Sequence, residues 1–225
     1  MNFTKNLILA ICFSINPEGP GFSFYIKPSV NFIPKEVFTN QTNWELVKSN
    51  KGINVYSQWI TLHDGFKTRR LKGELNVRMA MPDLVAFLLD GGKVKNWMVG
   101  VSESYNFKIQ DESSYSYARF SIPWPFNDQD LIVENRLDYP NGKDTAYIYL
   151  TSYPEMLPRM KGLKRMENFY GYWKVFRVSP TSSSVEYAVF SRSEPIAPRW
   201  IQDPIIMKTF WSSLDNLAAC CLENR

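Results

Sequence analysis

The chain has 225 residues, of which 44% are hydrophobic and 21% are charged, and its formal net charge is +4. This length favours one large domain over two small ones, and the composition excludes a disordered polymer and a protein with several transmembrane helices. The basic excess is small and contains no long lysine or arginine blocks, so we expect no nucleic-acid partner.

The first 43 residues predict an extended leader ahead of the domain. After Lys5 an apolar run covers residues 7–15, and a breaker with proline and glycine follows at 16–20; this is the order of parts in a secretory signal. The run is too short to cross a bilayer as a helix, and its cleavage motif is poor. A weak signal peptide and an N-terminal strand stay open as alternatives, so an exported or periplasmic location is only slightly favoured over a cytoplasmic one.

Alternating apolar and polar residues predict antiparallel strands from Trp44 onward. The first two are expected over residues 53–59 and 70–78, joined by a turn at 62–65. A short helix is expected over residues 82–90, because a proline opens it and two glycines follow it.

Six further strands are predicted after this helix. They cover residues 99–109, 114–122, 131–138, 145–152, 171–178 and 185–192. The last 27 residues place apolar side chains at three- and four-residue spacings from Trp200 to Cys221, which predicts one long amphipathic helix. A curved antiparallel sheet with this helix over one face is an α+β architecture.

Few residues could serve as metal ligands or catalytic groups. The single histidine, His63, lies in a predicted turn, and we interpret it as a solvent-exposed turn residue. Cys220 and Cys221 are adjacent and Cys12 lies near the N-terminus, so no zinc-ligand spacing exists. We therefore expect no metal and no other cofactor.

Several local motifs accompany this order of elements. They are Asp90 and Trp97, the stretch 117–133 with Pro-Trp-Pro at 123–125 and Asp130, Arg165, Gly-Tyr-Trp at 171–173, and the run 196–201. Together they resemble a START domain, a family of the wider Bet v 1-like (SRPBCC) group. The resemblance implies a helix-grip fold over residues 44–225, in which a curved antiparallel β-sheet wraps around the long C-terminal α-helix.

The resemblance also implies an internal tunnel that binds, and in some members transfers, a lipid or another hydrophobic small molecule. An enzyme of the Bet v 1-like group, a cyclase or hydrolase that uses the same cavity, is the alternative. Acid–base catalysis at neutral pH needs a histidine or a tuned carboxylate near the substrate, and the inward faces of the predicted strands offer neither. We therefore expect a non-catalytic binding domain.

Strand parity and the resemblance together predict the tunnel lining. Asn135 shares a face with Leu131 and Val133, and Ser116 shares one with Phe120. Some START domains carry a buried arginine facing an acidic residue where this chain has Asn135 and Ser116; a neutral pair avoids a desolvation cost of several kcal/mol per ion. The predicted ligand-binding residues are Ser116, Phe120, Trp124, Asn135, Ile148, Leu150, Trp173, Trp200, Phe210, Trp211 and Leu214.

The expected partner is a lipid or other apolar small molecule, and we expect a monomer. A basic cluster of Arg159, Lys161, Lys164 and Arg165 could make transient contact with an anionic membrane surface. A hydrated loop is the alternative for this cluster, and Arg165 could instead have a structural role.

Overall fold

The computed structural model describes residues 38–110, 113–122, 127–140, 142, 144–192 and 198–223. Within these ranges the strands form one sheet in the order β1-β3-β4-β11-β10-β8-β7-β6-β5, with β2 also paired to β3 and β9 to β7. The strands are β1 (Phe38–Gln41), β2 (Glu45–Asn50), β3 (Ile53–Leu62), β4 (Lys67–Val77), β5 (Val101–Gln110), β6 (Ser113–Phe120), β7 (Gln129–Asp138), β8 (Thr145–Ser152), β9 (Lys164–Arg165), β10 (Phe169–Ser179) and β11 (Ser182–Ser191). The helices are α1 (Met81–Leu89), η2 (Gly91–Lys93), α2 (Val94–Trp97), η3 (Pro154–Met156) and α3 (Arg199–Glu223).

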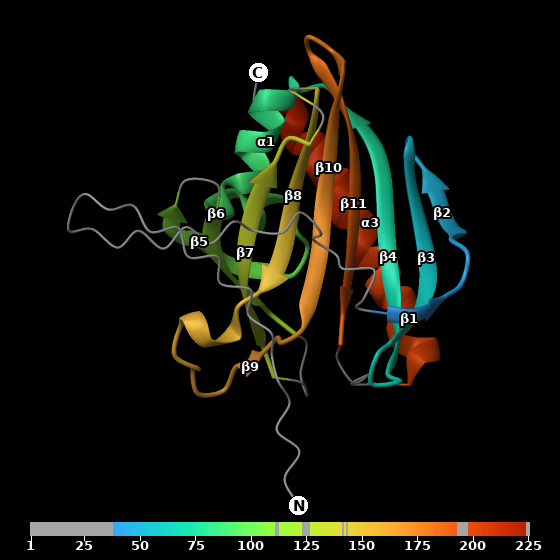
Figure 1. Ribbon diagram of the computed structural model, residues 1–225, viewed down its shortest axis with the longest axis vertical. Helices are drawn as coiled ribbons and strands as arrows, with labels where there is room; N and C mark the ends of the chain where they lie inside the picture. The colour runs from blue at the N-terminus through green and yellow to red at the C-terminus, as the bar shows by residue number, and fades with distance from the viewer. Residues whose placement is uncertain are drawn as a thin grey trace, which may run out of the picture. The chain divides into compact units, whose positions relative to one another are not determined.

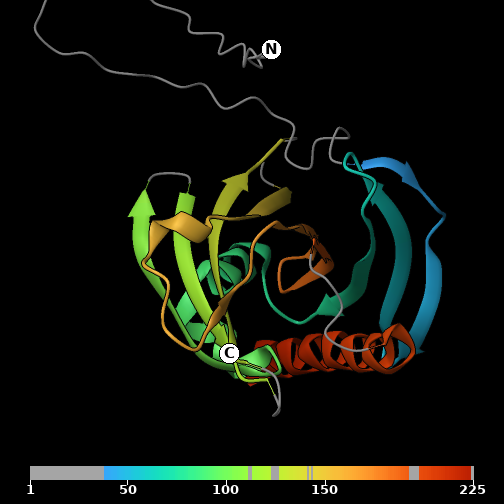
Figure 2. The same cartoon turned by 90° about the horizontal axis from the view of Figure 1, so that it is seen from below.

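The sheet curls around the C-terminal helix. Neighbouring strands are antiparallel throughout, apart from the short β9, which runs parallel to β7. Figures 1 and 2 show α3 lying across the open side of the curved sheet, with α1 and α2 beside it. The α+β, helix-grip architecture predicted from the sequence is therefore confirmed.

The strand borders follow from local turn chemistry. At the turn between β3 and β4, Gly65 takes a φ of +82° and its N–H donates to the carbonyl of Leu62, a backbone conformation that suits glycine. His63 is exposed in this turn, as predicted. Lys67, rather than Arg70, begins the next strand.

Helix α3 is seated unevenly. Leu214, Leu217 and Cys221 in its C-terminal half have no exposed surface, whereas Trp200 and Ile205 near its start are exposed. The helix approaches the sheet closely at Gly73 of β4: a Cβ atom added there would lie 2.2 Å from Cδ1 of Leu214. Glycine is thus required where the backbone of β4 and the helix approach each other.

Most buried apolar side chains form one core between the concave face of the sheet and helices α1, α2 and α3. Helix α1 contributes Leu84 and Leu88, and the sheet contributes Val55, Val175 and Ile148. A second, small cluster of Ile60, Leu62 and Phe190 is separate from this core.

Two strands differ from the sequence-based expectation. β1 pairs with β3, so the described sheet begins within the stretch 1–43 that we assigned to the leader. β9 is only two residues long, too short to produce an alternation. Residues 1–37, which contain the predicted signal segment, lie outside the described ranges, and the export prediction stays a prediction.

None of the described helices has the length and apolar character needed to cross a membrane. Within the same residues, no group of three or more histidine, cysteine, aspartate or glutamate side chains is placed to hold a metal ion.

Candidate functional site

A pocket of about 160 Å³ opens between the N-terminal half of α3 and the sheet. Its sheet side comes from β4, β10 and β11, and its helix side comes from the first turns of α3. The lining residues are Thr68, Arg69, Leu71, Met166, Phe169, Val189, Phe190, Ser191, Arg199, Gln202, Asp203, Ile206 and Met207. A larger, more open groove of about 390 Å³ follows the β1–β3 edge, but none of its lining residues belongs to α3.

Stacked aromatic rings lie directly beyond the apolar part of the pocket. Phe210 of α3 stacks on Tyr187 of β11 with ring centroids 5.5 Å apart, and Tyr187 stacks on Trp173 of β10 at 3.8 Å. Trp97 of α2 meets Trp173 edge-on at 5.7 Å. Val189 of β11 lines the pocket. Tyr187 lies two residues earlier in the same strand, so its side chain is on the same face. These four rings, here called the aromatic stack, belong to the core, next to the pocket lining.

The predicted ligand-binding residues lie mostly in the packed core, and Trp173 and Phe210 among them are part of this stack. Ile148, Leu150, Trp173, Trp211 and Leu214 are buried there, and Phe120 and Phe210 are partly buried against them. Because these side chains pack together, they leave no empty tunnel among them. An empty tunnel of about 500 Å³ would lower the free energy of unfolding by on the order of 10 kcal/mol. The lining of the 160 Å³ pocket includes none of the predicted ligand-binding residues that the structure describes. A ligand could reach those residues only if their side chains moved apart.

Two predicted residues need separate mention. Trp200 lies in the first turn of α3 and is 78% exposed, so it does not line the interior. Arg199 in the same turn does face the sheet, so Trp200 lies on the other side of this turn, and apolar spacing alone does not show which side the sheet covers. Trp124, with its neighbours in the Pro-Trp-Pro motif, lies outside the described residues.

Asn135 and Ser116 meet as strand parity predicted. Asn135 Nδ2 donates to Ser116 Oγ at 2.9 Å and to the Ser114 carbonyl at 3.2 Å. A Cβ atom on Gly91 of η2 would lie 3.0 Å from Ser116 Cβ, which places Ser116 beneath the helices that cover the concave face. The pair forms a neutral polar cluster in the interior, and its role toward a ligand stays a prediction.

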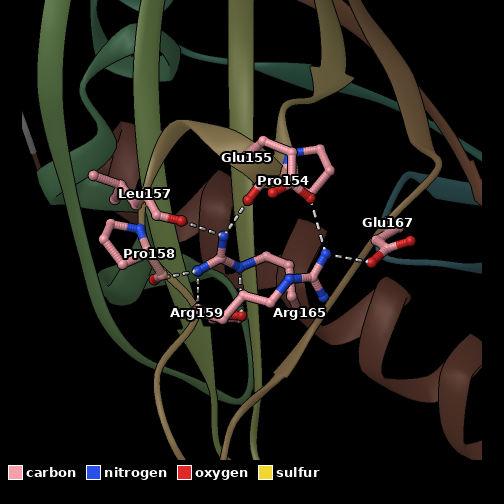
Figure 3. Close-up of polar contacts among 8 residues, drawn as sticks. Pro154, Glu155, Leu157, Pro158, Arg159, Arg165 and Glu167 are labelled. Carbon is pink, nitrogen blue, oxygen red and sulfur yellow. Dashed lines mark hydrogen bonds and ion pairs between the residues drawn. The ribbon is translucent and has the colours of Figure 1, made fainter.

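Arg165 is not a membrane-facing cation. Its Nε and Nη2 donate to the two carboxylate oxygens of Asp130 at 2.8 and 2.9 Å, and both side chains are 1% exposed. The same guanidinium donates to the carbonyls of Pro154, Leu157 and Pro158 (Figure 3). It therefore fixes the β8–β9 loop, which is the structural alternative that the sequence left open.

Arg159 of the basic cluster is also paired. It lies 2.9 Å from Glu155 and 2.8 Å from Glu167 (Figure 3). Both arginines of the cluster are therefore held by carboxylates, whereas Lys161 and Lys164 are exposed. A contact of these two lysines with a membrane stays a prediction.

The outer face of β6 and β7 is covered in part. Ile132 shares the parity of the charged residues Glu134 and Arg136, a pattern typical of a solvated face, but Ile132 is fully buried and Tyr117 of β6 is 1% exposed. They adjoin Asp130 and lie where Arg165 anchors the β8–β9 loop. Burial raises the pKa of Tyr117, and the nearby carboxylate of Asp130 adds to this shift, so this hydroxyl is neutral near pH 7.

Sequence reasoning missed two residues that line the pocket and one residue of the adjacent aromatic stack. Arg69 and Asp203 form an ion pair at 3.1 Å across the pocket, and Tyr187 is the central ring of the aromatic stack. Burial raises the pKa of Tyr187 above its ordinary value, so its hydroxyl is neutral at physiological pH. Arg69 shares the parity of Leu71 and Gly73; that alternation already contained the signal for an inward charge.

The fold defined by this sheet and helix is that of START domains. Similar solved structures include the STAR-related lipid transfer protein from Xanthomonas axonopodis (fragment 25–204), with a TM-score of 0.69, 25% identity, and coverage of 79% of this chain and 98% of that one. Human STARD10 follows with a TM-score of 0.65, 18% identity, and coverage of 80% and 74%. Human StAR-related lipid transfer protein 5 has a TM-score of 0.64, 16% identity, and coverage of 80% and 86%.

The scan against protein-family models gives no match, and the search of curated protein sequences gives none either. The resemblance to START domains that the sequence motifs carried is therefore confirmed through three-dimensional structure.

Proposed function

We propose that this chain is a non-catalytic domain that binds a lipid or another hydrophobic small molecule between its sheet and helix α3. The observation that carries the proposal is the pocket at the first turns of α3, whose lining includes Leu71, Val189 and Phe169. It occurs in a fold shared, at 25% identity, with a protein described as a STAR-related lipid transfer protein. Aromatic and aliphatic linings with a few placed polar groups are typical of sites for hydrophobic ligands.

The lining favours binding over catalysis. No histidine is among the lining residues, and their single carboxylate, Asp203, is held in an ion pair with Arg69. General acid–base catalysis needs a group free to exchange a proton with the substrate. The enzyme alternative therefore has no support among the groups that line this pocket.

The test of binding is native mass spectrometry of the purified full chain, followed by lipid extraction. We expect a co-purifying hydrophobic molecule, and a melting temperature that rises when the delipidated protein is given lipids, because a ligand that binds only the folded state stabilises it. An unchanged melting temperature across a lipid panel, together with no extracted lipid, would overturn the proposal.

The pocket opens beside the N-terminal half of α3, so a transferred ligand would leave past this half. The same half carries an exposed apolar surface. Trp200, Ile201 and Ile205 are all exposed next to the pocket. Tryptophan favours the interface between water and lipid. We propose that this turn, rather than the β8–β9 loop, makes the transient contact with a membrane.

Sedimentation with phosphatidylglycerol and phosphatidylcholine vesicles tests the membrane contact. Trp200→Ala should lower the vesicle-bound fraction several-fold. The matched control is Tyr139→Ala, which removes another exposed aromatic side chain at the opposite end of the sheet and should leave binding unchanged. Equal binding of wild type and Trp200→Ala would show that another surface makes the contact.

A further inference from the structure

The outer end of the pocket carries an excess positive charge. Arg69, Arg199 and Asp203 all line it, so two guanidinium groups face one carboxylate. Arg69 pairs with Asp203 at 3.1 Å. Arg199 donates to the backbone carbonyl of Lys67 at 3.3 Å, and within the described ranges no carboxylate lies at ion-pair distance from it. One positive charge is therefore left without a counter-ion among these groups.

The two arginines are held in place on a shared aromatic ring. The guanidinium carbon of Arg69 lies 4.7 Å from the ring centre of Trp59, and that of Arg199 lies 5.1 Å from the same centre. Stacking on an aromatic face orients the planar guanidinium while leaving its edge donors available. The Nε–H of Arg69 is buried and has no hydrogen-bond partner in the described part of the chain, so one donor at this end of the pocket is left without an acceptor.

The inner end of the pocket is apolar. Leu71 of β4 pairs with Val189 of β11, and both line the pocket. Two residues further inward along each strand, Gly73 pairs with Tyr187, which belongs to the aromatic stack. Phe169 and Ile206 also line the pocket. The polarity therefore changes along β4, from Arg69 at the outer end to Leu71 and then to the level of the aromatic stack.

The size of the pocket limits what fits without movement. A volume of about 160 Å³ corresponds to about five water molecules at ~30 Å³ each. This space holds a headgroup and the first carbons of a chain. A longer chain must displace the aromatic stack or the first turns of α3.

We propose that the ligand is a single-chain amphiphile with an anionic end, a carboxylate or a phosphate. The anionic end is bound by Arg69 and Arg199 and the chain points toward the aromatic stack. Guanidinium groups bind both anions through paired N–H donors. The carboxylate of Asp203 opposes such a ligand, so the two arginines must outweigh it. This inference rests on the proposed binding function and names its ligand class.

The experiment measures binding of the fluorescent polyene cis-parinaric acid and of its uncharged methyl ester to the full chain. The acid should bind about tenfold more tightly or better, because a charge-assisted hydrogen bond is about twice as strong as a neutral one. Arg69→Gln combined with Arg199→Gln should remove this preference, so that the acid binds no more tightly than its ester. Asp203→Asn should strengthen binding of the acid. Lysophosphatidic acid and lysophosphatidylcholine, as competitors, distinguish a phosphate from a carboxylate preference.

The matched control is Arg177→Gln, which removes an exposed arginine paired with Asp144 far from the pocket. It should behave as wild type, and unchanged melting temperatures of all variants exclude misfolding. If the wild type binds the acid and the ester equally tightly, the inference that the ligand is anionic is overturned, while the proposed binding function is retained. If neither probe binds but native mass spectrometry finds a lipid, the inference is again overturned and the proposed function is not.

Discussion

Asp130→Asn should lower the free energy of unfolding by about 3–5 kcal/mol, because it leaves the Arg165 guanidinium buried without its counter-ion. The two side chains are joined by two hydrogen bonds of 2.8 and 2.9 Å and are each 1% exposed. A cation that has lost its partner in such a place must be hydrated through local opening or remain uncompensated. Either outcome costs more than the loss of a surface pair.

The cost extends to the loop that Arg165 holds. The guanidinium also donates to the carbonyls of Leu157 at 3.1 Å and Pro158 at 3.2 Å, and this loop is anchored next to Ile132 and Tyr117. When the arginine moves toward water, these buried side chains should become accessible. Hydrogen exchange at the amides of β7 should report this opening along with the change in stability.

Urea denaturation measures the effect, and Asp144→Asn is its control. Asp144 pairs with Arg177 at the surface, where such pairs contribute about 0–1 kcal/mol. The double replacement Asp130→Leu with Arg165→Met should recover stability relative to Asp130→Asn, since apolar groups of similar volume leave no buried charge. A loss below about 1 kcal/mol for Asp130→Asn would mean that the pair is hydrated in solution.

The sequence predicted the fold well because its signals are periodic. Alternation over two residues assigned Asn135 and Ser116 to the inward face, and these side chains form a hydrogen bond of 2.9 Å. Three- and four-residue spacing predicted α3, which begins at Arg199 and ends at Glu223. Such patterns report which residues share a face of one element.

Periodicity does not report which segment covers a given face, and predictions of burial that depend on such a covering segment were wrong. Ile132 shares a face with charged residues, yet the loop anchored by Arg165 buries it. Trp200 has the apolar spacing of α3, yet it is 78% exposed while the neighbouring Arg199 contacts the sheet. Both outcomes depend on contacts between segments far apart in the chain, which alternation along one strand or helix does not encode.

The candidate site was predicted less well than the fold for the same reason. Arg69 belongs to β4 and Asp203 to α3, and only the seating of the helix brings them within 3.1 Å. That seating depends on Gly73, which looks unremarkable in the sequence. Its importance appears only when the position of the opposing helix is known.

Leu214→Ala should therefore destabilise the chain by about 2–5 kcal/mol, because it removes a fully buried side chain at a close approach of α3 to the sheet. Gly73→Ala should cost about 1–3 kcal/mol through overpacking, since its new methyl group would lie 2.2 Å from Leu214 Cδ1 and 3.2 Å from Phe210 Cε1. Each change alone disturbs the seating of the helix, one by a cavity and the other by a clash.

The two changes combined should cost less than the sum of their separate costs, because the methyl group that Gly73→Ala introduces fills space that Leu214→Ala vacates. A favourable coupling of about 0.5–3 kcal/mol is expected for side chains in direct contact, measured by urea denaturation of the four proteins in the cycle. Leu217→Ala is the matched control: Leu217 is equally buried but is not among the closest neighbours of Gly73, so its cost should add to that of Gly73→Ala. Additive costs for the Gly73 and Leu214 pair would instead mean that α3 shifts as a unit, and that this contact does not set the depth of the pocket.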